Sequence, residues 1–168
     1  MGLFDKLFGK KEPEIQLPAI ADDVIIALGA GELIDITTVS DAMFAEQMMG
    51  KSCAFKLTDA DVVAPVNGKI EVAFPTGHAF AVRANDGTGV LVHIGVDTVS
   101  LNGKGFKPLV KVGDTVKAGQ PCVKVDWSVV KGAGLDTSTM LIITEPVDGK
   151  TYDFIDPCTV QKYQQVNK

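Results

Sequence analysis

The chain has 168 residues, 46% of them hydrophobic, and this length can bury one full core without disulfide or metal staples. Its 21 acidic and 16 basic residues give a net charge of −5, and no basic stripe with interleaved aromatic residues is present, so the composition argues against a nucleic-acid partner. No apolar run approaches the roughly 20 residues of a membrane-spanning helix, and the N-terminus lacks a secretory signal. Three widely spaced cysteines favour reduced thiols, and together these features predict a cytoplasmic protein.

The first predicted element is a short arm over residues 1–14. Apolar residues recur at helical spacing among lysines in "MGLFDKLFGKK", which is typical of a small amphipathic helix. Such a helix can make weak contact with an anionic membrane surface through residues 1–11, but a helix of two turns is marginal alone, so a flexible arm is the alternative. Pro13 and Pro18 mark the entry to a single folded domain, expected over residues 15–168.

Short strands are expected through the rest of the chain. Runs rich in Val and Ile are interrupted by Gly, Asn, Asp or Pro at intervals of about eight to twelve residues, which indicates many short strands. The best helical candidate is 41–50, where Asp41 can cap a turn or two and Gly50 can end them.

An internal repeat supports the same fold class. Segments 27–36, 64–73 and 145–154 share a small or polar turn, a Gly at the same place and a strand-like run after it. Repeats of this kind predict an all-β protein, an antiparallel sandwich or barrel with internal duplication and minor short helices.

Both histidines of the chain, His78 and His93, fall in one predicted hairpin. "HAFAVR" and "GVLVHIG" flank "ANDGTG", in which Asn-Asp-Gly is a strong turn signal. Centring the turn on the Asp-Gly pair places Phe80 opposite His93 and His78 opposite Gly95. The two imidazoles would then share a sheet face, with their Cα atoms about 7–8 Å apart on a diagonal. A register shifted by one residue would send them to opposite faces.

Two imidazoles on an apolar sheet face suit phosphoryl transfer. Apolar surroundings disfavour the imidazolium, which keeps a histidine neutral and nucleophilic near pH 7. The second imidazole can donate a hydrogen bond to a phosphoryl oxygen while the first attacks phosphorus. Thr76, on the same predicted strand face as His78, can orient that ring, and Asp97 can hydrogen-bond nearby groups. The alternatives are that both histidines are structural, or that His78 and His93 are zinc ligands.

Three segments, "VVAPVNGKI", "TGHAFAV" and "VLVHIGVDTVSLNGKGFKPLVKVGDTVKAGQPCVKVD", carry a more specific pattern. In order and spacing they resemble the glucose-type IIA proteins of the bacterial phosphoenolpyruvate:sugar phosphotransferase system. The resemblance implies a phosphotransferase component without an obligatory cofactor, in which His93 is the phosphoryl acceptor and His78 its phosphate-stabilising partner. It also implies that the carrier HPr donates the group from a phosphohistidine, and that a cysteine in the IIB domain of a glucose-type sugar permease receives it.

A carrier of this kind needs a dry apolar rim that excludes water when a partner docks. The candidates for this partner-binding rim are Phe44, Phe74, Phe80, Val90, Leu91 and Val99. The alternative for each is plain core packing, because a strand exposes only one face.

Other functions stay open at this point. A regulatory protein would use the phosphorylation state of His93 to control docking onto other enzymes or transporters. A zinc peptidase-like relative would need H-x-x-x-D and H-x-H ligand sets, but Val82 and Gly95 stand at the required positions. A swinging-arm carrier would need a lysine at a hairpin tip, which "ANDGTG" lacks. The segment after Pro146 lacks the closing-strand pattern of the family, so its place in the sheet is not predicted.

Overall fold

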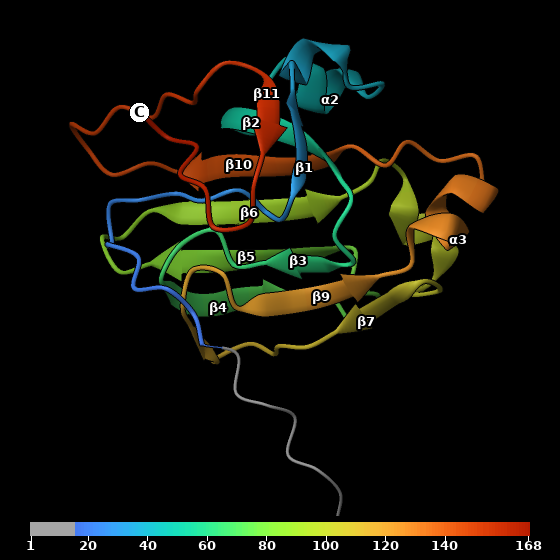
Figure 1. Cartoon of the computed structure of the whole chain (residues 1–168), viewed down its shortest axis with the longest axis horizontal. Helices are drawn as coiled ribbons and strands as arrows, with labels where there is room; N and C mark the ends of the chain where they lie inside the picture. Colours follow the sequence, from blue (N-terminus) through green and yellow to red (C-terminus); the bar gives the residue numbers. More distant parts are fainter. Residues whose placement is uncertain (1–15) are drawn as a thin grey trace, which may run out of the picture.

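The computed structural model describes residues 16–168, so the arm predicted over 1–14 lies outside the described residues. Within them, eight strands form one antiparallel sheet in the order β11-β1-β2-β10-β6-β5-β4-β8, and three form a second sheet in the order β3-β9-β7 (Figure 1). The larger sheet contains β1 (Gly31–Ile34), β2 (Lys51–Leu57), β4 (Gly68–Ala73), β5 (Ala79–Ala84), β6 (Gly89–Ile94), β8 (Thr115–Val116), β10 (Thr139–Glu145) and β11 (Cys158–Val160). The smaller contains β3 (Asp61–Val63), β7 (Phe106–Pro108) and β9 (Pro121–Val125). The predicted all-β antiparallel class is confirmed.

Helical segments are short and occupy the connections: η1 (Ile36–Thr38), α2 (Ala42–Ala45), η2 (Thr98–Leu101) and α3 (Trp127–Gly132). The carboxylate of Asp41 accepts the N–H of Met43 and caps α2, as the sequence predicts, and the helix ends after one turn. None of these helices, nor any other in residues 16–168, is long and apolar enough to cross a membrane.

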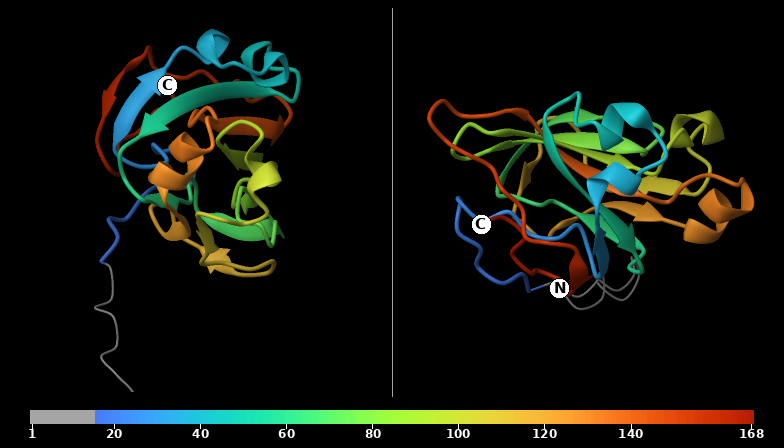
Figure 2. Two further views of the ribbon diagram at one scale, coloured as in Figure 1. Left: turned by 90° about the vertical axis from the view of Figure 1, so that its right-hand side faces the viewer. Right: turned by 90° about the horizontal axis from the view of Figure 1, so that it is seen from above.

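Two apolar clusters lie on opposite sides of the larger sheet. The main core fills the space between the two sheets, around which the larger sheet curls (Figure 2). A second, smaller cluster lies on the outer side, where Phe44 of α2 packs with residues of β2 and β10; it comprises Val39, Phe44, Ala54, Val96, Met140 and Ile142. The connection 35–50 therefore covers part of the outer sheet face, over β2 and β10.

The β5–β6 hairpin differs by one residue from the predicted register. Ala79 lies opposite His93, and Phe80 lies opposite Val92. The reason is a three-residue loop, 85–87, which the Ala84 N–H closes onto the Thr88 carbonyl at 2.8 Å. Gly87 takes the left-handed conformation, φ 99°, that such a loop requires at its last position.

Two predicted rim residues are wrong, Phe80 because of this register and Val90 because strand alternation places it on the opposite face of β6 from His93. Phe80 and Val90 are 1% and 0% exposed and belong to the main core. Their side chains point inward because alternation along the strand gives the outer face to Ala79, Ala81, Leu91 and His93.

The C-terminal segment closes the sheet at the edge opposite β8. Strand β11 pairs antiparallel with β1, and Ile26 and Phe154 form isolated bridges to Gln165 and Asn167. The third predicted repeat unit, 145–154, is wrong as a strand-entry unit, because no strand follows its turn. This stretch carries acidic residues and is followed by Pro157, and both features disfavour a regular ladder.

Candidate active site

His93 lies in a row of paired residues that crosses the outer sheet face. Ala79 is opposite it on β5 and Met140 on β10, and Phe74 continues the row beyond Ala79 through a backbone bond of 3.2 Å. Ala79 and Ala81 have small side chains, whereas Phe74 lies beside Ala79 and Phe44 lies against His93. The outer sheet face therefore has a shallow depression at Ala79, and the imidazole of His93 lies beside it.

His78 reaches the same place by a different route. It lies just before β5, in a bend, so the alternation of a strand does not fix its side chain. The Ile94 N–H donates to the His78 carbonyl at 2.7 Å and anchors the bend to the end of β6. The two imidazole centroids are 5.5 Å apart with the rings nearly perpendicular. The structure thus brings the histidines together even though the predicted register was wrong.

The hydrogen bond of His93 fixes its tautomer. Its Nδ1 lies 2.8 Å from the carbonyl oxygen of Gly95. A carbonyl only accepts, so Nδ1 carries the hydrogen and the lone pair of the neutral ring is on Nε2. Nε2 is then the nucleophilic atom.

Thr76 lies against His78, with its Oγ1 2.7 Å from the ring Nδ1. A hydroxyl can donate or accept, so this contact allows the tautomer in which Thr76 donates and His78 carries its hydrogen on Nε2. Thr76 occupies the turn that precedes β5 rather than the predicted strand position, yet its hydroxyl makes the expected contact with the ring.

The surroundings hold both rings in the neutral form. Burial lowers the pKa of His78. Burial also lowers the pKa of His93, against the opposing effect of the bond to Gly95, and the neighbouring His78 lowers it further. Asp41 and Asp97 act weakly in the opposite direction on the pKa of His93. Asp97 is exposed, has a left-handed backbone (φ 59°) and makes no side-chain cap bond to η2.

An apolar rim surrounds the pair. Phe44 packs against His93 and Phe74 against His78, each pair with tilted rings whose centroids are 4.9 Å apart. Phe44 is buried, Leu91 is half-buried, and Phe74 and Val99 are 43% and 55% exposed. The sequence interpretation missed Met43, 49% exposed on α2, and Val72, which pairs with Ala81 on the outer face. Val72 could not be placed from the sequence, because a bulge in β4 shifts the alternation of that strand between its two faces.

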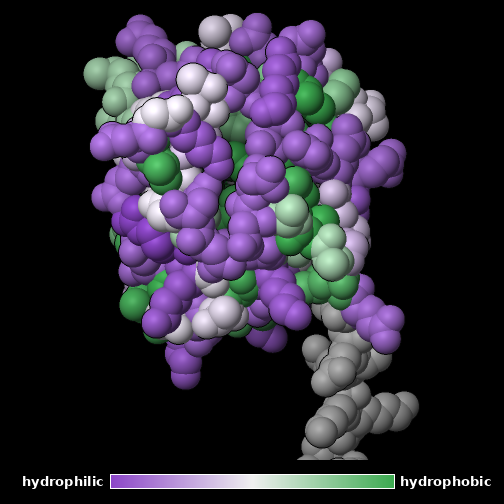
Figure 3. Space-filling view, turned by 90° about the vertical axis from the view of Figure 1, so that its left-hand side faces the viewer, coloured by the Kyte–Doolittle hydropathy of each residue, from purple (hydrophilic) through white to green (hydrophobic). Residues whose placement is uncertain are grey.

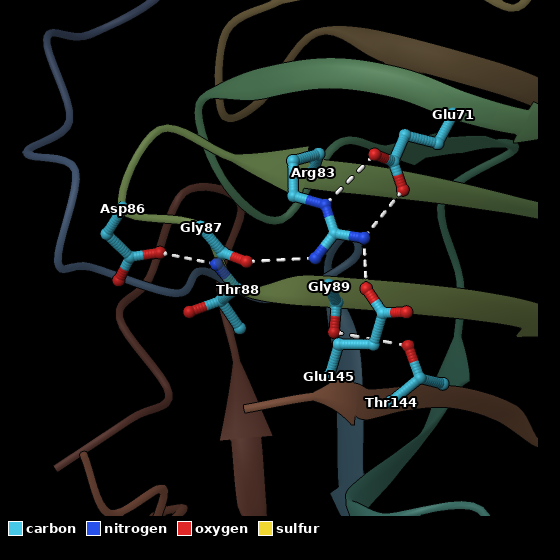
Figure 4. Close-up of polar contacts among 8 residues, drawn as sticks. All are labelled: Glu71, Arg83, Asp86, Gly87, Thr88, Gly89, Thr144 and Glu145. Carbon is cyan, nitrogen blue, oxygen red and sulfur yellow. Dashed lines mark hydrogen bonds and ion pairs between the residues drawn. The ribbon is translucent and has the colours of Figure 1, made fainter. Parts of the chain in front are cut away.

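The opposite end of the sandwich, which carries the β5–β6 turn, has a different character. Its surface is mostly hydrophilic, with apolar residues only in small separate patches (Figure 3). At this end Arg83 is paired with Glu71 and Glu145 (Figure 4), so its charge is neutralised locally. Within residues 16–168 no group of three or more His, Cys, Asp or Glu side chains is placed to hold a metal ion.

A histidine pair, His78 buried and His93 half-buried, inside an apolar rim on an antiparallel sandwich defines a phosphoryl-carrier type of site. Residues 23–148 match the family "phosphoenolpyruvate-dependent sugar phosphotransferase system, EIIA 1". The chain is 36% identical over 160 residues to a glucose-specific EIIA component from Staphylococcus aureus, covering 95% of this chain and 93% of that protein. It is 37% identical over 158 residues to a glucose-specific EIICBA component from Staphylococcus carnosus, covering 94% of this chain but only 23% of that protein.

A solved structure gives the same assignment. Glucose permease IIA from Mycoplasma capricolum superposes with a TM-score of 0.79 at 37% identity, covering 86% of this chain and 93% of that one. The chain belongs to the EIIA 1 family of the phosphoenolpyruvate-dependent sugar phosphotransferase system. Its members are phosphotransferase components that carry a phosphoryl group between HPr and a IIB domain.

Proposed function

We propose that His93 is the phosphoryl acceptor of this carrier and that a glucose-type permease is its destination. The observation that carries the first part is the bond from His93 Nδ1 to the Gly95 carbonyl, which leaves Nε2 free beside a second imidazole. The EIICBA relatives, whose names join three components in one chain, support the second part.

The phosphoryl group would move in two displacement steps at phosphorus. His93 Nε2 attacks the phosphorus of phospho-HPr, a new N–P bond forms, and the donor's N–P bond breaks with its electron pair returning to the donor imidazole. A cysteine thiolate of the IIB domain then attacks, an S–P bond forms, and His93 recovers its lone pair. His78, with its hydrogen on Nε2, donates to a phosphoryl oxygen during both steps, and Thr76 holds that ring through the contact at 2.7 Å. Asp97 has the smaller role of a nearby charge.

The rim would receive both partners in turn. Apolar contacts to a partner would come from Phe74, Leu91, Val99 and Met43. The buried Phe44 packs against the His93 ring and supports it. A phosphoryl group on His93 would place negative charge at the centre of this surface. Any enzyme or transporter that docks here would therefore sense the phosphorylation state.

The remaining expectations belong to the same proposal. Residues 15–168 would act as one IIA domain, in the cytoplasm, with residues 1–14 as an accessory arm whose residues 1–11 make weak membrane contact. The three cysteines are free thiols, two of them buried, which accords with a reducing compartment. Zinc would need ligands from a docked partner in addition to His78 and His93.

The test is the intact mass of the protein after incubation with phosphoenolpyruvate, the first enzyme of the relay and HPr. The proposal expects a gain of one phosphoryl group that mild acid removes and that His93→Ala abolishes. Normal phosphorylation of His93→Ala at another residue would overturn the assignment.

A further inference from the structure

We infer that Asp136 is a positioning residue for phosphoryl transfer, acting through the peptide group that holds His93. This inference rests on the proposed role of His93. Asp136 lies in the connection between α3 and β10 and does not touch either histidine.

The backbone link has two hydrogen bonds on one peptide unit. The Val96 N–H donates to the Asp136 carbonyl at 2.9 Å, and the Gly95 carbonyl accepts the Nδ1 hydrogen of His93 at 2.8 Å. The Gly95 carbonyl and the Val96 N–H belong to the same peptide plane, so a bond at one end fixes and polarises the other. The Asp136 carbonyl therefore sets both the direction and the accepting strength of the oxygen that holds His93.

The side chain of Asp136 fixes that carbonyl in place. It accepts the Ser138 N–H at 2.8 Å, closing a local turn, and it pairs with Lys56 of β2 at 3.1 Å. It also accepts the hydroxyl of Ser40 at 2.9 Å. Ser40 precedes Asp41 and the helix that carries Phe44, so one carboxylate ties the connection before α2 to the connection before β10.

The carboxylate stays charged throughout the working range. Its partial burial works to raise the pKa of Asp136, but the bonds from Ser138, Lys56 and Ser40 prevail and hold the pKa far below the ordinary value. The tie is thus present at any pH at which the imidazole is neutral.

Asp86 provides a matched control. Its carboxylate also accepts the N–H two residues ahead, from Thr88 at 2.9 Å (Figure 4). It pairs with a lysine as well, Lys150, at 2.6 Å. It lies in the β5–β6 turn, at the far end of the hairpin from His93. Asp86→Ala therefore removes a similar turn, ion pair and charge without touching the peptide at Gly95.

The experiment is ¹⁵N NMR of the His93 ring in the unphosphorylated protein, together with the rate of phosphorylation by phospho-HPr. In Asp136→Ala the fraction of His93 with its hydrogen on Nδ1 should fall, and the rate should fall about three- to tenfold, the range expected when one hydrogen bond weakens. Asp136→Asn should restore both, because its amide oxygen can still accept from Ser138. Asp86→Ala should change neither.

Three other results would overturn the role of Asp136. An unchanged tautomer in Asp136→Ala would overturn the inference, as would an equal change in Asp86→Ala. If Asp136→Ala does not fold, Ser40→Ala removes only one contact of the Asp136 carboxylate. It should lower the fraction of His93 with its hydrogen on Nδ1 by a smaller amount, and an unchanged fraction would also overturn the inference. The tautomer of His93 is measured in the unphosphorylated protein, so this measurement does not depend on whether His93 is the acceptor. If His93 were not the acceptor, only the phosphorylation assay of His93→Ala would show it.

Discussion

Gly95→Ala should damage the site and the fold together. Gly95 has a left-handed backbone, φ 72°, which costs a residue with a side chain about 1–2 kcal/mol. A Cβ there would lie 2.4 Å from Thr98 Cγ2 and 3.2 Å from the Asp136 carbonyl oxygen, so Thr98, whose hydroxyl is bonded to the Ile94 carbonyl, must shift. Overpacking of this kind adds about 1–3 kcal/mol. We expect a loss of about 2–5 kcal/mol of unfolding free energy, and slower phosphorylation because the Gly95 carbonyl is displaced.

The control is Gly134→Ala, in the connection after α3. Gly134 has nearly the same φ, 74°, but a Cβ added there meets nothing within 4 Å, so only the backbone cost of about 1–2 kcal/mol applies. Urea unfolding measures the stabilities of both variants, and phosphorylation by phospho-HPr measures their function. If Gly95→Ala were no less stable than Gly134→Ala and were phosphorylated at the wild-type rate, the claim that a rigid Gly95 carbonyl fixes His93 would be refuted.

Three further predictions concern the histidines and the rim. His78→Gln should still accept the phosphoryl group from phospho-HPr but pass it on to a IIB domain at least tenfold more slowly, because a glutamine amide donates from a different position; equal rates in both steps would contradict the role of His78. The ring of His93 should titrate by NMR below the ordinary midpoint of about 6.5, because burial lowers its pKa. The free energy of unfolding should therefore fall as the pH drops from about 6.5 toward the folded-state pKa, because the unfolded chain binds the proton more readily. A midpoint at or above about 6.5 would contradict this prediction. Val99→Lys should weaken docking of HPr, measured as a higher KM for phospho-HPr with unchanged unfolding free energy, since Val99 is 55% exposed; an unchanged KM would remove Val99 from the rim.

The fold class was predictable because short Val- and Ile-rich runs between glycines and prolines favour strands. The hairpin register was not, because Asn-Asp-Gly fits both a two-residue turn and the three-residue loop that the structure has. The histidines meet nonetheless because His78 lies outside the strand, where alternation does not apply. Phe80 was misassigned for the same one-residue reason, because the shift changes which residues of β5 share a face with His93. Val90 is three residues from His93 on β6, so strand alternation alone places it on the opposite face in either register.

The atoms that orient His93 could not be read from side-chain chemistry. One is the Gly95 carbonyl and another is the Asp136 carbonyl, and backbone groups carry no residue-specific signal. Thr76 was within reach of prediction because it is two residues from His78, whereas Asp136 is far along the chain and reaches the site only through the fold.

The most direct test of the account is the position of the phosphorus atom on the His93 ring. With ¹⁵N-labelled histidine, the coupling between ³¹P and ¹⁵N in the phosphorylated protein identifies the bonded nitrogen. The hydrogen bond to the Gly95 carbonyl predicts phosphorus on His93 Nε2, with Nδ1 still bonded to that carbonyl. Phosphorus on Nδ1, or on any nitrogen of His78, would contradict it.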